Sequence, residues 1–137
     1  YDFDPSALDQ WPAGQLTLPG YEEPMRFLPC GQTLAHILSR AAEGLYGRAH
    51  LGIVATGDKF VADPHFGDYL QKEFGALACE MEGGAIAHAC LVNKIPCAVL
   101  RTISDNAHDS ETVDFVTFAK SSAEKAQQLL RAVLPQL

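Results

Sequence analysis

The sequence predicts an α/β fold in which helices pack on a parallel β-sheet. Short apolar runs alternate with amphipathic helical patterns from residue 32 onward, which is the order expected when helices connect parallel strands. The apolar runs are continuous, as in strands that are buried on both faces. A length of 137 residues fits a single domain, and no internal repeat divides it.

The composition is that of a globular protein with an acidic surface. Hydrophobic residues make up 47% of the chain and charged residues 20%, which excludes a largely disordered polypeptide. Seventeen acidic residues against ten basic ones give a net charge of −7, which argues against nucleic-acid or anionic-membrane binding through bulk electrostatics. No apolar run approaches the roughly 18 residues of a membrane span. We therefore expect neither nucleic acid nor membrane as a partner.

Prolines and apolar spacing divide the chain into a loop-rich start and an ordered remainder. Five of the eight prolines lie in residues 1–31, where Pro19-Gly20 signals a turn. Apolar residues at spacings of three and four indicate a helix over 32–45, with Gly47 as its stop signal. In chain order we predict helix 32–45, strand 51–56, helix 66–74, strand 76–81, helix 83–93, strand 96–104 and helix 112–134.

The cysteine and histidine spacings predict neither a metal site nor a redox motif. No two of the four cysteines have C-x-x-C spacing, and the five histidines show no metal-ligand pattern. Cys79, Cys90 and Cys97 lie within apolar stretches, so we expect buried, reduced thiols and a cytoplasmic setting. Gly83-Gly84 does not match the dinucleotide pattern G-x-G-x-x-G. We expect no metal and no cofactor.

Polar residues follow each of the three predicted strands. These groups occupy residues 56–61, 79–84 and 103–106. Ligands of open α/β sheets bind outside the carboxyl ends of the strands, and parallel strands bring those ends to one rim. The convergence of the three groups predicts an active site there.

Asp105 and Arg101 are candidates for chemistry within the last of these groups. A carboxyl group directly after an apolar run is partly desolvated, which raises its pKa and suits a general acid. A turn in which Asp105 pairs with Asn106 explains the same position equally well. Arg101 lies inside the apolar run, where a guanidinium needs a carboxylate or a ligand as partner, and a structural ion pair is the alternative.

Two glutamates flank Met81, and in an extended chain they face the same side. An ionised carboxylate can accept two hydrogen bonds from a sugar diol, so Glu80 and Glu82 are candidate ligand-binding groups. Helix capping is the alternative for one of them, and we expect only one to touch a ligand. Phe60 can stack on a flat ring, although a phenylalanine near a strand end more often belongs to the core.

Three segments in order resemble a known family. They are EMEGGAIAH at 80–88, RTISDNA at 101–107 and TGDKF at 56–60. Together they resemble the C-terminal half of the 5′-methylthioadenosine/S-adenosylhomocysteine nucleosidases, which belong to the nucleoside phosphorylase superfamily. The resemblance implies a three-layer α/β/α fold and hydrolysis of an N-glycosidic bond with release of adenine. A purine nucleoside phosphorylase of the same superfamily and a non-catalytic nucleoside-binding fragment remain alternatives.

The resemblance also implies roles for single residues. Asp105 would protonate N7 of adenine as general acid, Ser104 would help to orient it, Phe60 would stack on adenine, and the backbone of Val61 would read the edge of the base. On the sugar side, Glu82 would bind the ribose hydroxyls, Met81 would pack against the ribose, Glu80 joins them as a substrate-binding candidate, and Arg101 would lie near the attacking water.

The same resemblance implies that residues 1–137 are the C-terminal part of a single nucleosidase domain. Residues 1–31 would lie near a homodimer interface, and residues 32–137 would carry the site. The general-base glutamate of the family lies in the N-terminal part, which this sequence lacks, so we expect a complementary N-terminal segment as partner and an inactive isolated chain. His108 departs from the family, which often has aspartate there.

Overall fold

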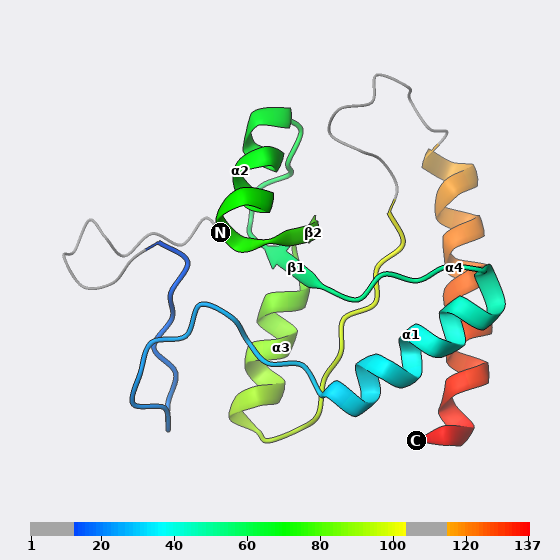
Figure 1. Cartoon of the computed structure of the whole chain (residues 1–137), viewed down its shortest axis with the longest axis horizontal. Helices are drawn as coiled ribbons and strands as arrows, with labels where there is room; N and C mark the ends of the chain where they lie inside the picture. Colours follow the sequence, from blue (N-terminus) through cyan, green and yellow to red (C-terminus); the bar gives the residue numbers. More distant parts are fainter. Residues whose placement is uncertain (1–12, 104–114) are drawn as a thin grey trace.

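The computed structural model describes residues 13–103 and 115–137, and these form helices around a small sheet (Figure 1). In chain order the elements are α1 (Gln32–Tyr46), β1 (Ile53–Thr56), α2 (Pro64–Phe74), β2 (Ala76–Glu80), α3 (Gly83–Val92), α4 (Phe115–Val133) and the short 3-10 helix η2 (Leu134–Gln136). The four predicted helices and the first two predicted strands are confirmed with small shifts at their ends. Residues 112–114 of the last predicted helix lie outside the described residues.

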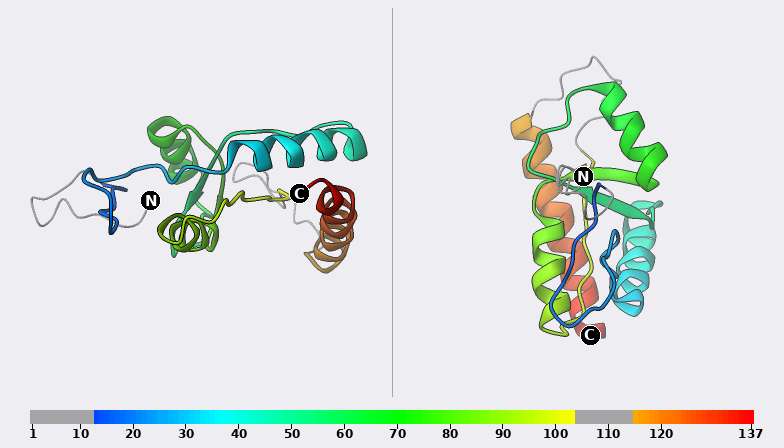
Figure 2. Two further views of the ribbon diagram at one scale, coloured as in Figure 1. Left: turned by 90° about the horizontal axis from the view of Figure 1, so that it is seen from below. Right: turned by 90° about the vertical axis from the view of Figure 1, so that its left-hand side faces the viewer.

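The two strands form a parallel pair connected by α2. Thr56 at the end of β1 pairs in register with Glu80 at the end of β2, so the polar residues that follow both strands start from the same edge. Helices α2 and α3 lie on opposite sides of the strands (Figure 2). This arrangement confirms the parallel pairing and the predicted convergence for two of the three strand ends.

The third predicted strand is wrong for the described residues 96–103. This segment runs without regular secondary structure beside the sheet, and a hydrogen bond from Gly31 N–H to the carbonyl of Cys97 (2.8 Å) holds its start. Its apolar composition favours a strand, but a strand also needs a neighbour that completes its hydrogen-bond ladder, and none in the described part of the chain does so. Ile103, at the end of this segment, is 59% exposed.

The expectation of strands buried on both faces is also wrong. Along β2 buried and exposed residues alternate, so that Ala76 is buried and Leu77 is exposed. Cys79 is exposed for the same reason, whereas Cys90 and Cys97 are half-buried. All four cysteines are free in the structure.

The core consists of two separate clusters. The first lies between α2 and the sheet, and its buried residues are Ala55, Leu70, Phe74 and Ala76. The second lies between α1 and α4, and its buried residues are Ala42, Leu129 and Val133. The hydroxyl of Tyr46 on α1 also donates to the Lys125 carbonyl of α4 at 2.5 Å. The pair α1–α4 therefore forms a unit beside the sheet (Figure 1).

Local sequence signals explain the helix ends. Asp63 caps α2 by accepting a hydrogen bond from the backbone N–H of His65 at 3.0 Å, and Pro64 occupies the first helical turn, where its missing N–H costs nothing. Gly47 ends α1 in the left-handed conformation with φ 77°, as its stop signal predicted. No described helix is both long and apolar enough to cross a bilayer.

Residues 13–31 attach to the sheet unit through side chains. Within this stretch, an isolated antiparallel bridge joins Leu16 and Met25 through backbone hydrogen bonds of 2.8 and 2.7 Å. Arg26 then reaches the last turn of α2, where its Nη2 lies 2.6 Å from a carboxylate oxygen of Glu73 and its guanidinium lies 4.3 Å from the centre of the Phe74 ring.

Candidate active site

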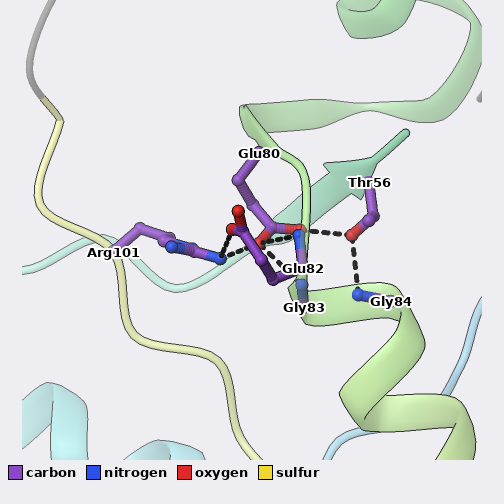
Figure 3. A network of polar contacts seen from close by, with 6 residues as sticks. All are labelled: Thr56, Glu80, Glu82, Gly83, Gly84 and Arg101. Carbon is purple, nitrogen blue, oxygen red and sulfur yellow. Dashed lines mark hydrogen bonds and ion pairs between the residues drawn. The ribbon is translucent and has the colours of Figure 1, made fainter. Parts of the chain in front are cut away.

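Four polar side chains meet where the two parallel strands end (Figure 3). Thr56 is the last residue of β1, Glu80 is the last residue of β2, and Glu82 directly precedes α3. Arg101 arrives from the irregular segment that follows α3. The structure thus brings three predicted site residues together, and it adds Thr56.

Glu80 caps the N-terminus of α3. Its Oε2 accepts hydrogen bonds from the backbone N–H groups of Glu82 (3.1 Å) and Gly83 (2.7 Å), and its carboxylate also binds the Thr56 hydroxyl and the Arg101 guanidinium. The first N–H groups of a helix lack partners within the helix and carry partial positive charge, so a carboxylate is well placed there. The Glu80 side chain is only 6% exposed. The capping alternative therefore describes Glu80.

Glu82 has the opposite environment. Its side chain is 65% exposed and makes no capping hydrogen bond to α3, although it occupies the N-cap position. Its Oε2 lies 2.9 Å from Nη2 of Arg101. Of the two carboxylates, Glu82 is the one that presents oxygen atoms to solvent, where a ligand can reach them.

Arg101 bridges the two glutamates. The same nitrogen, Nη2, pairs with Glu80 and with Glu82. Arg101 itself is exposed, so the structural ion pair describes it, and the expected burial of its guanidinium does not occur. Two carboxylates and one guanidinium leave the cluster with a formal charge of −1. Such a cluster favours a ligand that is a hydrogen-bond donor or that develops positive charge.

Thr56 belongs to the polar group predicted after the first strand, but the sequence interpretation gave it no role of its own. Its hydroxyl donates to Glu80 and accepts from the backbone N–H of Gly84 at 2.8 Å. A Cβ atom at Gly84 would lie 2.9 Å from the Cβ of Thr56, and one at Gly83 would lie 2.9 Å from Oε1 of Glu80. The pair of glycines after the second strand was the available signal, because it permits a helix to start this close to a strand end.

The remaining candidates lie in the loops at the same edge or beyond the described residues. Phe60 is 75% exposed, which leaves its ring open to a ligand, and Met81 between the two glutamates is exposed as well. Val61 is partly buried and packs against the hydrophobic cluster between α2 and the sheet. Ser104 and Asp105 lie outside the described residues.

Two cavities adjoin the polar group formed by Thr56, Glu80, Glu82 and Arg101. A hollow of about 350 Å³ has Thr56, Gly83 and Gly84 in its wall, and a larger one of about 690 Å³ has Arg101, Thr102 and Ile103 in its wall. Both volumes are in the range of small-molecule sites. Within residues 13–103 and 115–137, no three His, Cys, Asp or Glu side chains gather in a way that would hold a metal ion.

This chain belongs to the phosphorylase superfamily, whose family model matches residues 2–135. It is 32% identical to the aminodeoxyfutalosine nucleosidase of Helicobacter pylori strain 26695, over 88% of this chain and 55% of that protein. It is 33% identical to the 5′-methylthioadenosine/S-adenosylhomocysteine nucleosidase of Shewanella frigidimarina, over 85% of this chain and 51% of that protein.

Solved structures agree with the family and with the predicted fold class. A Campylobacter jejuni 5′-methylthioadenosine/S-adenosylhomocysteine nucleosidase superposes with a TM-score of 0.83 at 31% identity, over 100% of this chain and 57% of the other. The nucleoside phosphorylase-like α/β fold that the three sequence segments implied is thereby confirmed. The chain spans about half the length of the curated relatives it matches.

Proposed function

We propose that this chain carries the nucleoside-binding and acid-donating part of an enzyme that hydrolyses an N-glycosidic bond. The observation that carries this proposal is the pairing of an exposed carboxylate, Glu82, with Arg101 at the common end of two parallel strands. The names of the relatives support it, because they are nucleosidases. The hydrolysed bond would join a purine base to C1′ of a ribose.

The chemistry follows from the charges that develop when this bond breaks. Electrons flow to the base, so protonation of adenine N7 by Asp105 makes it a neutral leaving group, with Ser104 orienting the acid. Positive charge develops on the sugar, where the net negative charge of Glu80, Glu82 and Arg101 stabilises it. Water then attacks C1′ near Arg101 and gives up its proton to a general base, the glutamate that the family resemblance assigns to the N-terminal part of the domain.

Substrate recognition is divided between the base and the sugar. Phe60 stacks on adenine, and the backbone of Val61 reads its edge. Glu82 accepts hydrogen bonds from the two ribose hydroxyls, and Met81 packs against the ribose ring. Glu80 has its acceptor sites filled by protein donors and supports the site without a direct contact to substrate.

We propose 5′-methylthioadenosine and S-adenosylhomocysteine as substrates. Aminodeoxyfutalosine is the second candidate, because aminodeoxyfutalosine nucleosidases of Helicobacter pylori and Campylobacter jejuni are 32% and 36% identical to this chain. Phosphorolysis in place of hydrolysis is the mechanistic alternative. Product analysis with and without phosphate distinguishes the two reactions, since only phosphorolysis yields a sugar phosphate.

The test of the reaction is the substitution Asp105→Asn. Because a nucleosidase would need a further part of the domain, the N-terminal part of the Campylobacter jejuni relative is joined to residues 1–137, and released adenine is measured by chromatography. An amide cannot deliver the proton, so we expect kcat to fall by about 10²- to 10⁴-fold. Asp68→Asn on the exposed face of α2 is the matched control and should keep full activity. Near-normal turnover of Asp105→Asn would refute the general-acid assignment.

A further inference from the structure

We propose that Thr56 and Glu80 are positioning residues which hold the start of α3 and the guanidinium of Arg101, and thereby orient the carboxylate of Glu82 toward a bound ribose. The ribose part of this inference rests on the proposed function. The orientation of Glu82 is a property of the free protein and can be tested without any ligand.

The Glu80 carboxylate is held in a fixed position. A carboxylate has about four acceptor positions on its two oxygens. Here Oε1 accepts from the Thr56 hydroxyl, and Oε2 accepts from two backbone N–H groups, those of Glu82 and Gly83, and from Arg101. With 6% of its side chain exposed, Glu80 has no room for a ribose hydroxyl and no free rotation.

Thr56 connects three elements of the fold, β1, β2 and α3. Its hydroxyl has one proton, which it gives to Glu80, and it accepts the N–H of Gly84. A single side chain from β1 therefore binds the end of β2 and the first turn of α3. The close approach at Gly83 and Gly84 leaves no space for a Cβ atom, so this contact depends on both glycines.

Arg101 links the fixed Glu80 carboxylate to Glu82. Nη2 of Arg101 contacts Oε2 of Glu80 and, at 2.9 Å, Oε2 of Glu82. Because Glu80 is held in place, it also holds the guanidinium, which then restrains one oxygen of the otherwise exposed Glu82. The second oxygen of Glu82 points away from this ion pair (Figure 3) and is the one that a diol would reach first.

The experiment compares Thr56→Val, which keeps the shape and removes the hydroxyl, with Thr56→Ser, which keeps the hydroxyl. Nuclear magnetic resonance on the 137-residue chain reports the amide signal of Gly84 and the side-chain carboxyl carbon of Glu82. We expect Thr56→Val to move both signals and Thr56→Ser to leave both close to wild type. Thr33→Val, the same change at an exposed position of α1, should move neither.

Glu80→Gln is the second variant and keeps the inference testable if Thr56→Val does not fold. It removes the charge that holds Arg101, so the Glu82 carboxyl signal should move. An unchanged Glu82 signal in a folded Thr56→Val or Glu80→Gln chain would overturn the inference.

The functional readout uses the joined protein described above. Thr56→Val should lower kcat/KM for the nucleoside by about 10- to 100-fold through misplacement of Glu82, leave free-adenine affinity unchanged, and be rescued by Thr56→Ser. Equal loss of nucleoside and adenine binding would indicate general damage and overturn the positioning role. If the wild-type protein releases no adenine, the proposed function fails, and the two resonance signals still decide whether Thr56 and Glu80 orient Glu82.

Discussion

Two carboxylates that lie two residues apart receive different tasks from their surroundings. Glu80 is enclosed by donors from β1, α3 and the segment of Arg101, and it stabilises the helix start. Glu82 shares only the arginine with it and is otherwise exposed. An exposed ion pair of this kind stabilises a fold by about 0–1 kcal/mol, so the proposed value of Glu82 lies in binding and not in stability.

Substitution of Glu82 by glutamine should weaken nucleoside binding more than adenine binding. The amide keeps the shape but cannot accept the same pair of charged hydrogen bonds from a diol, which adenine lacks. A loss of about 1.5–3 kcal/mol is expected for the nucleoside. Calorimetry with both ligands measures it, with Glu124→Gln on α4 as an exposed control. Equal losses for the two ligands would argue against the ribose role.

The thiol of Cys97 should react slowly with alkylating agents. The pKa of Cys97 is raised, mainly because the thiol is partly buried. A hydrogen bond with the Cys90 thiol and the proximity of the Cys90 and Cys30 thiols raise it further. A raised pKa means less thiolate at a given pH, and the thiolate is the nucleophile. In iodoacetamide labelling at pH 8, read by peptide mass spectrometry, the exposed Cys30 should react before Cys97, and the Cys97 rate should keep rising at higher pH. Denaturant should remove the difference, and equal native rates would contradict the prediction.

Among the elements, the pair α1–α4 depends on a narrow apolar contact. Apolar residues on one face of each amphipathic helix meet in the cluster around Leu129 and Val133, both 1% exposed. The next residue along α4, Leu130, is 48% exposed, because a turn of 100° carries it off the contact face. Neighbouring leucines therefore offer a matched test of packing.

Leu129→Ala should destabilise the fold by about 2–5 kcal/mol, because it removes buried methyl groups and leaves a cavity. Leu130→Ala should change the free energy of unfolding by no more than about 0.5 kcal/mol, as surface substitutions do. Chemical denaturation followed by circular dichroism measures both. Similar values for the two variants would mean that α4 does not pack on α1 through this face.

At the scale of the whole molecule, the described residues leave much apolar surface uncovered. Two small clusters replace one continuous core, and two cavities open beside the sheet. Exposed apolar side chains occur on the strands and on the irregular segment, as at Leu77, Leu100 and Ile103. A strand edge with such surface invites pairing with a further strand. With about half of the relatives' length present, we propose that the rest of the domain covers this surface, and that the whole acts as a homodimer.

The chain alone should therefore hydrolyse no nucleoside at an enzymatic rate, and addition of the complementary N-terminal part should produce activity. The physical reason is the lack of an identified general base together with the uncovered sheet edge. Residues 1–137 and the N-terminal part of a relative are expressed separately and mixed, and adenine release and molecular mass are followed. A soluble monomer that alone turns over methylthioadenosine at about 1–10³ s⁻¹ would refute this prediction.

The sequence by itself determined the helices, the first two strands and the edge at which the site forms. These features depend on local information: apolar spacing indicates α1 and α4, glycine and proline mark the helix ends, and an apolar run followed by polar residues marks a strand end. The segments at 56–60, 80–88 and 101–107 also predicted the superfamily correctly, because their order and spacing are specific.

Only the tertiary structure decided three features: that residues 96–103 form no strand, that Cys79 is exposed, and that Glu80 and Glu82 have different roles. Each depends on a neighbour distant in the chain. A strand needs a partner for its hydrogen bonds, and burial needs a second element on the same face. The task of a carboxylate likewise depends on which donors surround it. Thr56 reaches Glu80 and Gly84 across 24 and 28 residues; the glycine pair signals a close approach at this point, but it does not identify the partner.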